Sequence, residues 1–227
     1  MSTNDIFNSE FSRRYDASNA RFSPISANLH FLMALQLQDL PADAHILCVG
    51  VGTGNEVLSL ADSYPGWRFT GVDPSADMLA VCDQKIRQAG IEHRCDLLAG
   101  YLEDIAGGEK FDAVLCLLVT HFIRQNDRGG IYHQIAARLK TSGRLIVAEI
   151  AADMAADNID DQLRRWAALQ AYGSTSAPTV EEIKQLFEER LRVQPPAATE
   201  ALMRDAGFSA PDHFFQSLLI HAWAARK

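Results

Sequence analysis

The stretch HILCVGVGTGNE at residues 45–56 decides the fold of this chain. Its first half is apolar, as in a buried strand, and Gly50, Gly52 and Gly54 follow before a helical pattern begins. Glycine is needed where the backbone turns with positive φ and where a ligand must approach without a Cβ in the way. The stretch therefore predicts a tight strand-to-helix turn beneath a bound nucleoside.

A second apolar stretch, FTGVD, ends in Asp73. This residue lies about 20 positions beyond the glycines, where nucleoside-binding folds place the carboxylate that holds the ribose hydroxyls. The alternative is that Asp73 only caps the following helix, with Pro74 in the first turn. A nicotinamide cofactor is disfavoured, because the pattern GxGxxG would require a glycine where this chain has Asn55.

Short apolar runs alternate with helical patterns through the middle of the chain, which is typical of βαβ units. The predicted strands are 45–50, 68–72, 95–99, 111–118 and 144–150. Right-handed crossovers would place the connecting helices on both faces of a parallel sheet. Residues 158–172 and 180–191 predict two inserted helices, and residues 213–226 predict a closing antiparallel strand pair.

Composition narrows the function classes. The 227 residues are 48% hydrophobic and 22% charged, which supports one sizeable α/β core. The net charge of -8 argues against a nucleic-acid substrate and favours a small molecule. No apolar run approaches the roughly 18 residues of a membrane span, and the first residues lack the apolar centre of a signal peptide, so we expect a cytoplasmic protein without a membrane partner. The four cysteines form no CxxC pair, so no metal site is predicted.

Four segments resemble, in order and spacing, the motifs of class I S-adenosylmethionine-dependent methyltransferases. They are ILCVGVGTG at 46–54, FTGVDPSADML at 69–79, FDAVLCLLVTHF at 111–122 and LKTSGRLIVAEI at 139–150. The resemblance implies a Rossmann-like α/β fold: a mostly parallel seven-stranded sheet with helices on both faces, an antiparallel C-terminal strand and a small helical insert. It also implies S-adenosyl-L-methionine as the cofactor.

By that resemblance, specific residues would hold the cofactor. Gly50, Gly52 and Gly54 would line its methionine and ribose, Asp73 would bind the ribose hydroxyls, Tyr101 and Leu102 would border the adenine, and Cys116 and Leu117 would lie near the sulfonium. The chain departs from the family pattern where an acidic residue is usual, at Cys48 and at Tyr101. With Tyr101 there, we expect the adenine to be held more by stacking than by a hydrogen bond.

Three further residues are candidates near the reacting groups. His121 follows the fourth predicted strand, at the mouth of such a site, and is a candidate general base. Its alternative role is packing beside Phe122. Tyr15 and Arg21 are candidates for a lid over the methionine end, with Arg21 pairing the cofactor carboxylate, or for ordinary surface and packing positions.

The organisation predicts four parts with distinct roles. Residues 1–44 form an N-terminal helical lid, 45–150 the cofactor-binding core, 151–196 a helical insert that forms the acceptor pocket, and 197–227 the helix and strands that complete the core. The expected function is methyl transfer to a small-molecule acceptor. The acceptor itself, the use of a general base and the formation of a homodimer are left open by the sequence.

Two alternative functions also fit the sequence. The C-terminal run AGFSAPDHFFQSLLIHAWAARK resembles the bacterial carboxy-S-adenosylmethionine synthases of tRNA wobble-uridine modification, in which a cation such as Lys184 or Arg190 would face the extra carboxylate. The other alternative is a non-catalytic cofactor-binding regulator.

Overall fold

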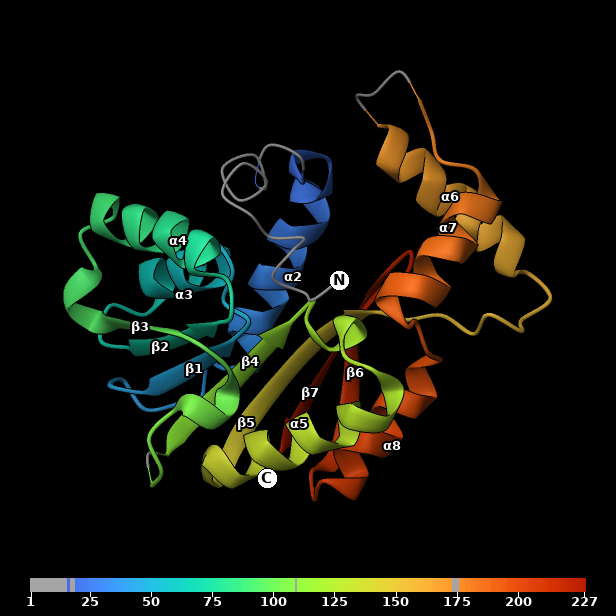
Figure 1. Cartoon of the computed structure of the whole chain (residues 1–227). Helices are drawn as coiled ribbons and strands as arrows, with labels where there is room; N and C mark the ends of the chain where they lie inside the picture. Colours follow the sequence, from blue (N-terminus) through green and yellow to red (C-terminus); the bar gives the residue numbers. More distant parts are fainter. Residues whose placement is uncertain (1–15, 17–18, 109, 173–175) are drawn as a thin grey trace.

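The computed structural model describes residue 16 and residues 19–108, 110–172 and 176–227. Its centre is a seven-stranded sheet in the order β3-β2-β1-β4-β5-β7-β6 (Figure 1). The first five strands in the chain pair in parallel, whereas β7 runs antiparallel to both β5 and β6. The strands are β1 His45–Val49, β2 Arg68–Asp73, β3 Cys95–Ala99, β4 Phe111–Leu117, β5 Leu139–Ile150, β6 Ser209–Ser217 and β7 Ile220–Arg226.

Helices cover both faces of the sheet. Helices α2, α3 and α4 lie against one face and α5 and α8 against the other (Figure 1). Side chains of α2, α3 and α4 pack with β1 and β2 in one apolar cluster, and side chains of α5 and α8 pack in another. All five residues of β1 are buried, as expected of a strand covered on both faces. The helices are α2 Ser23–Gln36, α3 Asn55–Ser63, α4 Ala76–Gln88, α5 Gln125–Arg138 and α8 Pro196–Asp205, with short turns η2 Ala20–Phe22, η3 Glu92–Arg94, η4 Leu102–Asp104 and η5 Thr120–Phe122.

The predicted insert is a helical unit that follows β5. It consists of α6 Ile159–Ala171, α7 Val180–Leu186 and the π-helical turn η6 Phe187–Leu191. Thr179 and Glu182 form a capping box at the start of α7. The Ala152 N–H donates to the Gln194 carbonyl over 3.0 Å, so the two ends of the insert meet. The unit packs through its own apolar cluster against β5, β6 and β7.

The predicted fold class is confirmed, and β5 and β6 both begin earlier than predicted, β6 at Ser209 and not at His213. The difference is greater in β5. This strand begins at Leu139, not at Arg144, because the buried Leu139 pairs with Phe111 ahead of an irregularity in the ladder. Residues 140–143, between Leu139 and Arg144, form a bulge in which Ser142 adopts a φ of 63°. In the part of the chain that the structure describes, no helix is long and apolar enough to cross a membrane.

Candidate cofactor and acceptor site

The glycine turn joins β1 to α3 at the carboxyl end of the sheet. Gly50, Gly52 and Gly54 have φ values of 65°, 53° and 76°. A Cβ at Gly50 would come within 2.4 Å of a methyl group of Val119, and one at Gly54 within 2.5 Å of the Cys82 sulfur. Glycine at Gly50 therefore lets the turn approach the end of β4, whereas Gly54 serves the packing of the turn against α4.

Asp73, the last residue of β2, fastens this turn to the start of α4. Its Oδ2 accepts the Gly52 N–H over 2.9 Å and its Oδ1 accepts the Ser75 N–H over 2.8 Å. Burial raises the pKa of Asp73, and these two hydrogen bonds only partly oppose it. The N-cap of α4 is Ser75, whose Oγ accepts the Met78 N–H, so the alternative that Asp73 caps this helix is excluded. Each carboxylate oxygen of Asp73 retains a lone pair for a further donor.

A cavity of about 220 Å³ opens between the glycine turn, Asp73 and the end of β4. Its walls are mostly apolar, and Asp73 is the one carboxylate among the described residues that line it. An apolar slot with a single convergent acid fits a nucleoside, which has a flat base and a diol. The lining comprises Val49, Gly50, Gly52, Val72, Asp73, Pro74, Met78, Gly100, Tyr101, Leu102, Leu117, Leu118, Val119, Phe122, Ile123 and Ile131.

Tyr101 and Leu102 occupy different depths of this cavity. Leu102 is buried, whereas Tyr101 is 54% exposed, so its ring lies at the rim. The Tyr101 N–H donates to Asp104 over 2.8 Å, which fixes the backbone there. Leu117 also lines the cavity, while its neighbour Cys116 is fully buried in the core. The rim position leaves the Tyr101 ring free to stack on a bound base.

The structure buries His121 behind the cavity. Its Nδ1 accepts the Ile150 N–H over 3.3 Å, and burial lowers its pKa to about 3, with the nearby Arg128 charge adding to the shift. Phe122, whose ring centroid lies 4.6 Å from that of His121, lines the cavity, and His121 does not. This arrangement fits the packing alternative for His121 better than a general base.

Arg128 holds the turn after β4 to the insert. Its side chain is fully buried and donates to the carbonyls of Ile123, His121 and Arg192 over 3.1, 3.4 and 2.6 Å. Two of these carbonyls belong to the turn that borders the cavity, and the third lies just after the insert helices. Arg128 therefore fixes the position of the insert relative to the cavity.

Of the two N-terminal lid candidates, Arg21 and Tyr15, the structure describes Arg21. The Arg21 guanidinium donates to the Gln170 carbonyl near the end of α6 and lies 5.9 Å from the centroid of the Phe22 ring. Arg21 therefore contacts the insert, and it is outside the lining of the cavity. Tyr15 lies outside the described residues.

Comparison with known proteins agrees with this geometry. Residues 46–143 match the family model described as a methyltransferase domain. The dTDP-3-amino-3,6-dideoxy-alpha-D-glucopyranose N,N-dimethyltransferase of Streptomyces fradiae is 30% identical over 118 residues. Residues 46–143 are therefore assigned to the methyltransferase domain family. S-Adenosyl-L-methionine is the cofactor of this family.

Other relatives show how far the match extends. The S. fradiae match covers 51% of this chain and 43% of the relative, so the chain spans less than half of that protein. The carboxy-S-adenosyl-L-methionine synthase of Dichelobacter nodosus is 25% identical over 201 residues, which cover 88% of this chain and 82% of that one. The structure of an O-methyltransferase family 2 protein from Planctomyces limnophilus has a TM-score of 0.68 at 17% identity, over 99% of this chain and 63% of that chain.

The departure of this chain from the family pattern at Cys48 is accompanied by a carboxyl group that the sequence did not reveal. Glu56, in the first turn of α3, interacts electrostatically with Cys48 and Asp73. Burial raises the pKa of Glu56 to about 7, and the Asp73 charge adds to this shift. A carboxyl group near the glycine turn is thus supplied from α3, and its place directly after Gly54-Asn55 was the available signal.

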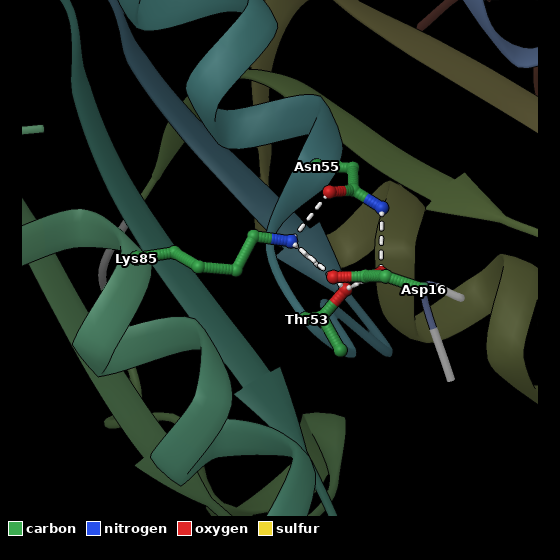
Figure 2. Close-up of polar contacts among 4 residues, drawn as sticks. All are labelled: Asp16, Thr53, Asn55 and Lys85. Carbon is green, nitrogen blue, oxygen red and sulfur yellow. Dashed lines mark hydrogen bonds and ion pairs between the residues drawn. The ribbon is translucent and has the colours of Figure 1, made fainter. Parts of the chain in front are cut away.

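A polar cluster beside the same turn was also missed. It consists of Asp16, Thr53, Asn55 and Lys85, which we call the Asp16 cluster (Figure 2). Asp16 lies 37 positions from Thr53 and 69 from Lys85 in the sequence. No local pattern indicates contacts over such separations.

Proposed function

We propose that this protein transfers the methyl group of S-adenosyl-L-methionine to a small-molecule acceptor. The observation that carries the proposal is the apolar cavity between the glycine turn and Asp73. Gly50 and Gly52 would border the methionine and ribose, and Asp73 would accept the ribose hydroxyls. Tyr101 and Leu102 would enclose the adenine, and Leu117 would lie nearest the sulfonium.

The acceptor would bind where the insert and α2 approach the ends of β4 and β5. Partly buried apolar side chains gather there around the third apolar cluster, among them Phe22, Ile25, Leu118, Ile150 and Met154. Methyl transfer depends chiefly on positioning the nucleophile in line and excluding water, and such positioning can contribute about 7–11 kcal/mol. A dedicated base is not required, which agrees with the burial of His121.

A carboxy-S-adenosylmethionine synthase is the second candidate, supported by the length of the match to the D. nodosus enzyme. Its extra carboxylate would need a facing cation. Lys184 is paired with Asp160 at 2.6 Å, and Arg190 lines an open groove on the insert together with Arg21. Neither cation lines the cofactor cavity, so this geometry favours the plain methyl donor.

Mass spectrometry of the purified protein under native conditions tests the cofactor directly. We expect S-adenosylmethionine or S-adenosylhomocysteine to copurify or to bind when added. A carboxylated analogue in their place would support the second candidate instead.

Transfer is then measured with cofactor labelled in its methyl group, incubated with separated small-molecule, RNA and protein fractions of a cell extract. We expect label in the small-molecule fraction, and none with a Gly50→Ala control. Label only in RNA or protein would overturn the acceptor class. Tight binding without transfer to any fraction would instead support the regulator alternative.

A further inference from the structure

The Asp16 cluster joins three segments that are distant in sequence. Asp16 Oδ1 accepts hydrogen bonds from Thr53 Oγ1 and Asn55 Nδ2 over 2.8 and 3.2 Å, and Asp16 Oδ2 pairs with Lys85 Nζ at 2.9 Å (Figure 2). Lys85 Nζ also donates to Asn55 Oδ1 over 2.5 Å and to Thr53 Oγ1 over 3.3 Å. These hydrogen bonds and the ion pair therefore link Asp16, in the segment before α2 that we call the N-terminal segment, to the glycine turn and to α4.

The cluster acts on the turn that forms the cofactor cavity. Thr53 stands between Gly52 and Gly54 and is 3% exposed. Gly52 lines the cavity and donates its N–H to Asp73. A restraint on Thr53 is therefore a restraint on the backbone that would contact a bound nucleoside.

Arg21 and Phe22, further along the N-terminal segment, contact the insert. Arg21 donates to the Gln170 carbonyl, and the Phe22 ring lies 5.6 Å from the Trp166 ring, between centroids. Asp16 thus anchors the N-terminal segment to the glycine turn, and Arg21 and Phe22 anchor the same segment to α6. Loss of the Asp16 contacts would remove the described link from this segment to the glycine turn and leave its contacts with α6 in place.

The Asp16–Lys85 pair differs from an ordinary surface ion pair on the same helix. Its side chains are 42% and 20% exposed and share two further polar partners. The Arg87–Asp83 pair is 65% and 47% exposed and lies within α4. Burial would raise the pKa of Asp16, but hydrogen bonds from Lys85, Thr53 and Asn55 lower it below its ordinary value. The two shared partners therefore hold the Asp16–Lys85 pair in one geometry, which an isolated exposed pair lacks.

We infer that Asp16 and Lys85 are positioning residues for the cofactor, because their ion pair fastens the N-terminal segment to the glycine turn and slows cofactor release. This inference rests on the cofactor binding in the proposed function. It assigns Lys85 no contact with the cofactor itself.

The test measures the rate of S-adenosylhomocysteine release by stopped flow in the full-length protein. The variants are Asp16→Asn, Lys85→Met and their combination, with Arg87→Met as the matched control on α4. We expect each single change to speed release about tenfold, equivalent to about 1.4 kcal/mol at 25 °C. The double variant should release no faster than the faster single variant, because both changes remove the same pair.

Two readouts separate this role from a general loss of stability. Melting temperatures of the Asp16→Asn and Lys85→Met variants should stay close to that of Arg87→Met. Added salt should speed release from the wild type but not from Lys85→Met, because salt screens a partly exposed pair.

Several results would overturn the inference. If the single variants release S-adenosylhomocysteine at the Arg87→Met rate, the inference fails and the proposed function stands. The same follows if the effect of the double variant equals the product of the two single effects. A wild-type protein that binds no S-adenosylhomocysteine would overturn the proposed function and this inference together.

Discussion

Replacement of Asp73 by alanine separates the ribose-binding role of this carboxylate from its structural role. An ionised carboxylate that accepts two ribose hydroxyls makes hydrogen bonds worth roughly 1.5–3 kcal/mol each. Asp73→Ala should therefore cost about 3 kcal/mol or more in cofactor binding, which is about a hundredfold or greater increase in Kd.

The same substitution should also lower stability, because the structure gives Asp73 two backbone partners. The Gly52 and Ser75 N–H groups would lose their acceptor. Loss of one acceptor for a buried donor costs about 1–3 kcal/mol, and water entering the cavity can replace part of it. We expect the free energy of unfolding to fall by about 2–3 kcal/mol, more than the about 1 kcal/mol of a lost helix cap.

Titration calorimetry with S-adenosylhomocysteine and urea denaturation on the same samples measure both effects. Ser75→Ala is the control, since it removes the N-cap of α4 and keeps the Asp73 carboxylate. It should lower stability by about 1 kcal/mol and leave the Kd within about threefold of wild type. Asp73→Asn should weaken binding too, because its amide has one acceptor oxygen and no charge. An Asp73→Ala variant with lowered stability and an unchanged Kd would show that Asp73 is only structural.

Four other predictions follow from the site. Gly50→Ala should abolish measurable cofactor binding in calorimetry, because its Cβ would meet Val119 at 2.4 Å and its φ is 65°; normal binding would contradict this. Glu56 has a pKa of about 7 against an ordinary 4.5, so the stability from its protonated form is present below pH 4.5 and lost as pH rises through 7. In urea denaturation at pH 8, the free energy of unfolding of Glu56→Gln should exceed that of the wild type by up to about 3 kcal/mol. Parallel curves of this free energy against pH for the two proteins would refute the prediction. His121→Asn should leave the pH profile of kcat/KM unchanged, whereas loss of a wild-type inflection would restore the general-base role. Deletion of residues 152–196 with a short linker should abolish methyl transfer in the labelling assay and retain some cofactor binding, and full activity would refute the acceptor role of the insert.

The sequence by itself determined the features that depend on local chemistry. Apolar runs fixed the strands, because parallel strands buried on both faces need continuous apolar residues. The glycine turn was readable because Gly50 and Gly54 adopt backbone conformations that disfavour other residues. The capping box of α7 was readable because Thr179 and Glu182 are only three positions apart.

Only the tertiary structure decided the features that depend on contacts between distant segments. Local spacing was compatible with Asp73 as a cap, and only the folded turn showed that its oxygens hold Gly52 and Ser75 while Ser75 is the cap. His121 looked available at a strand end, but the packing of Arg128 and β5 around it leaves it buried and neutral. Asp16 and Lys85 gave no signal, because a pair 69 positions apart forms only after the sheet has brought α4 and the glycine turn together.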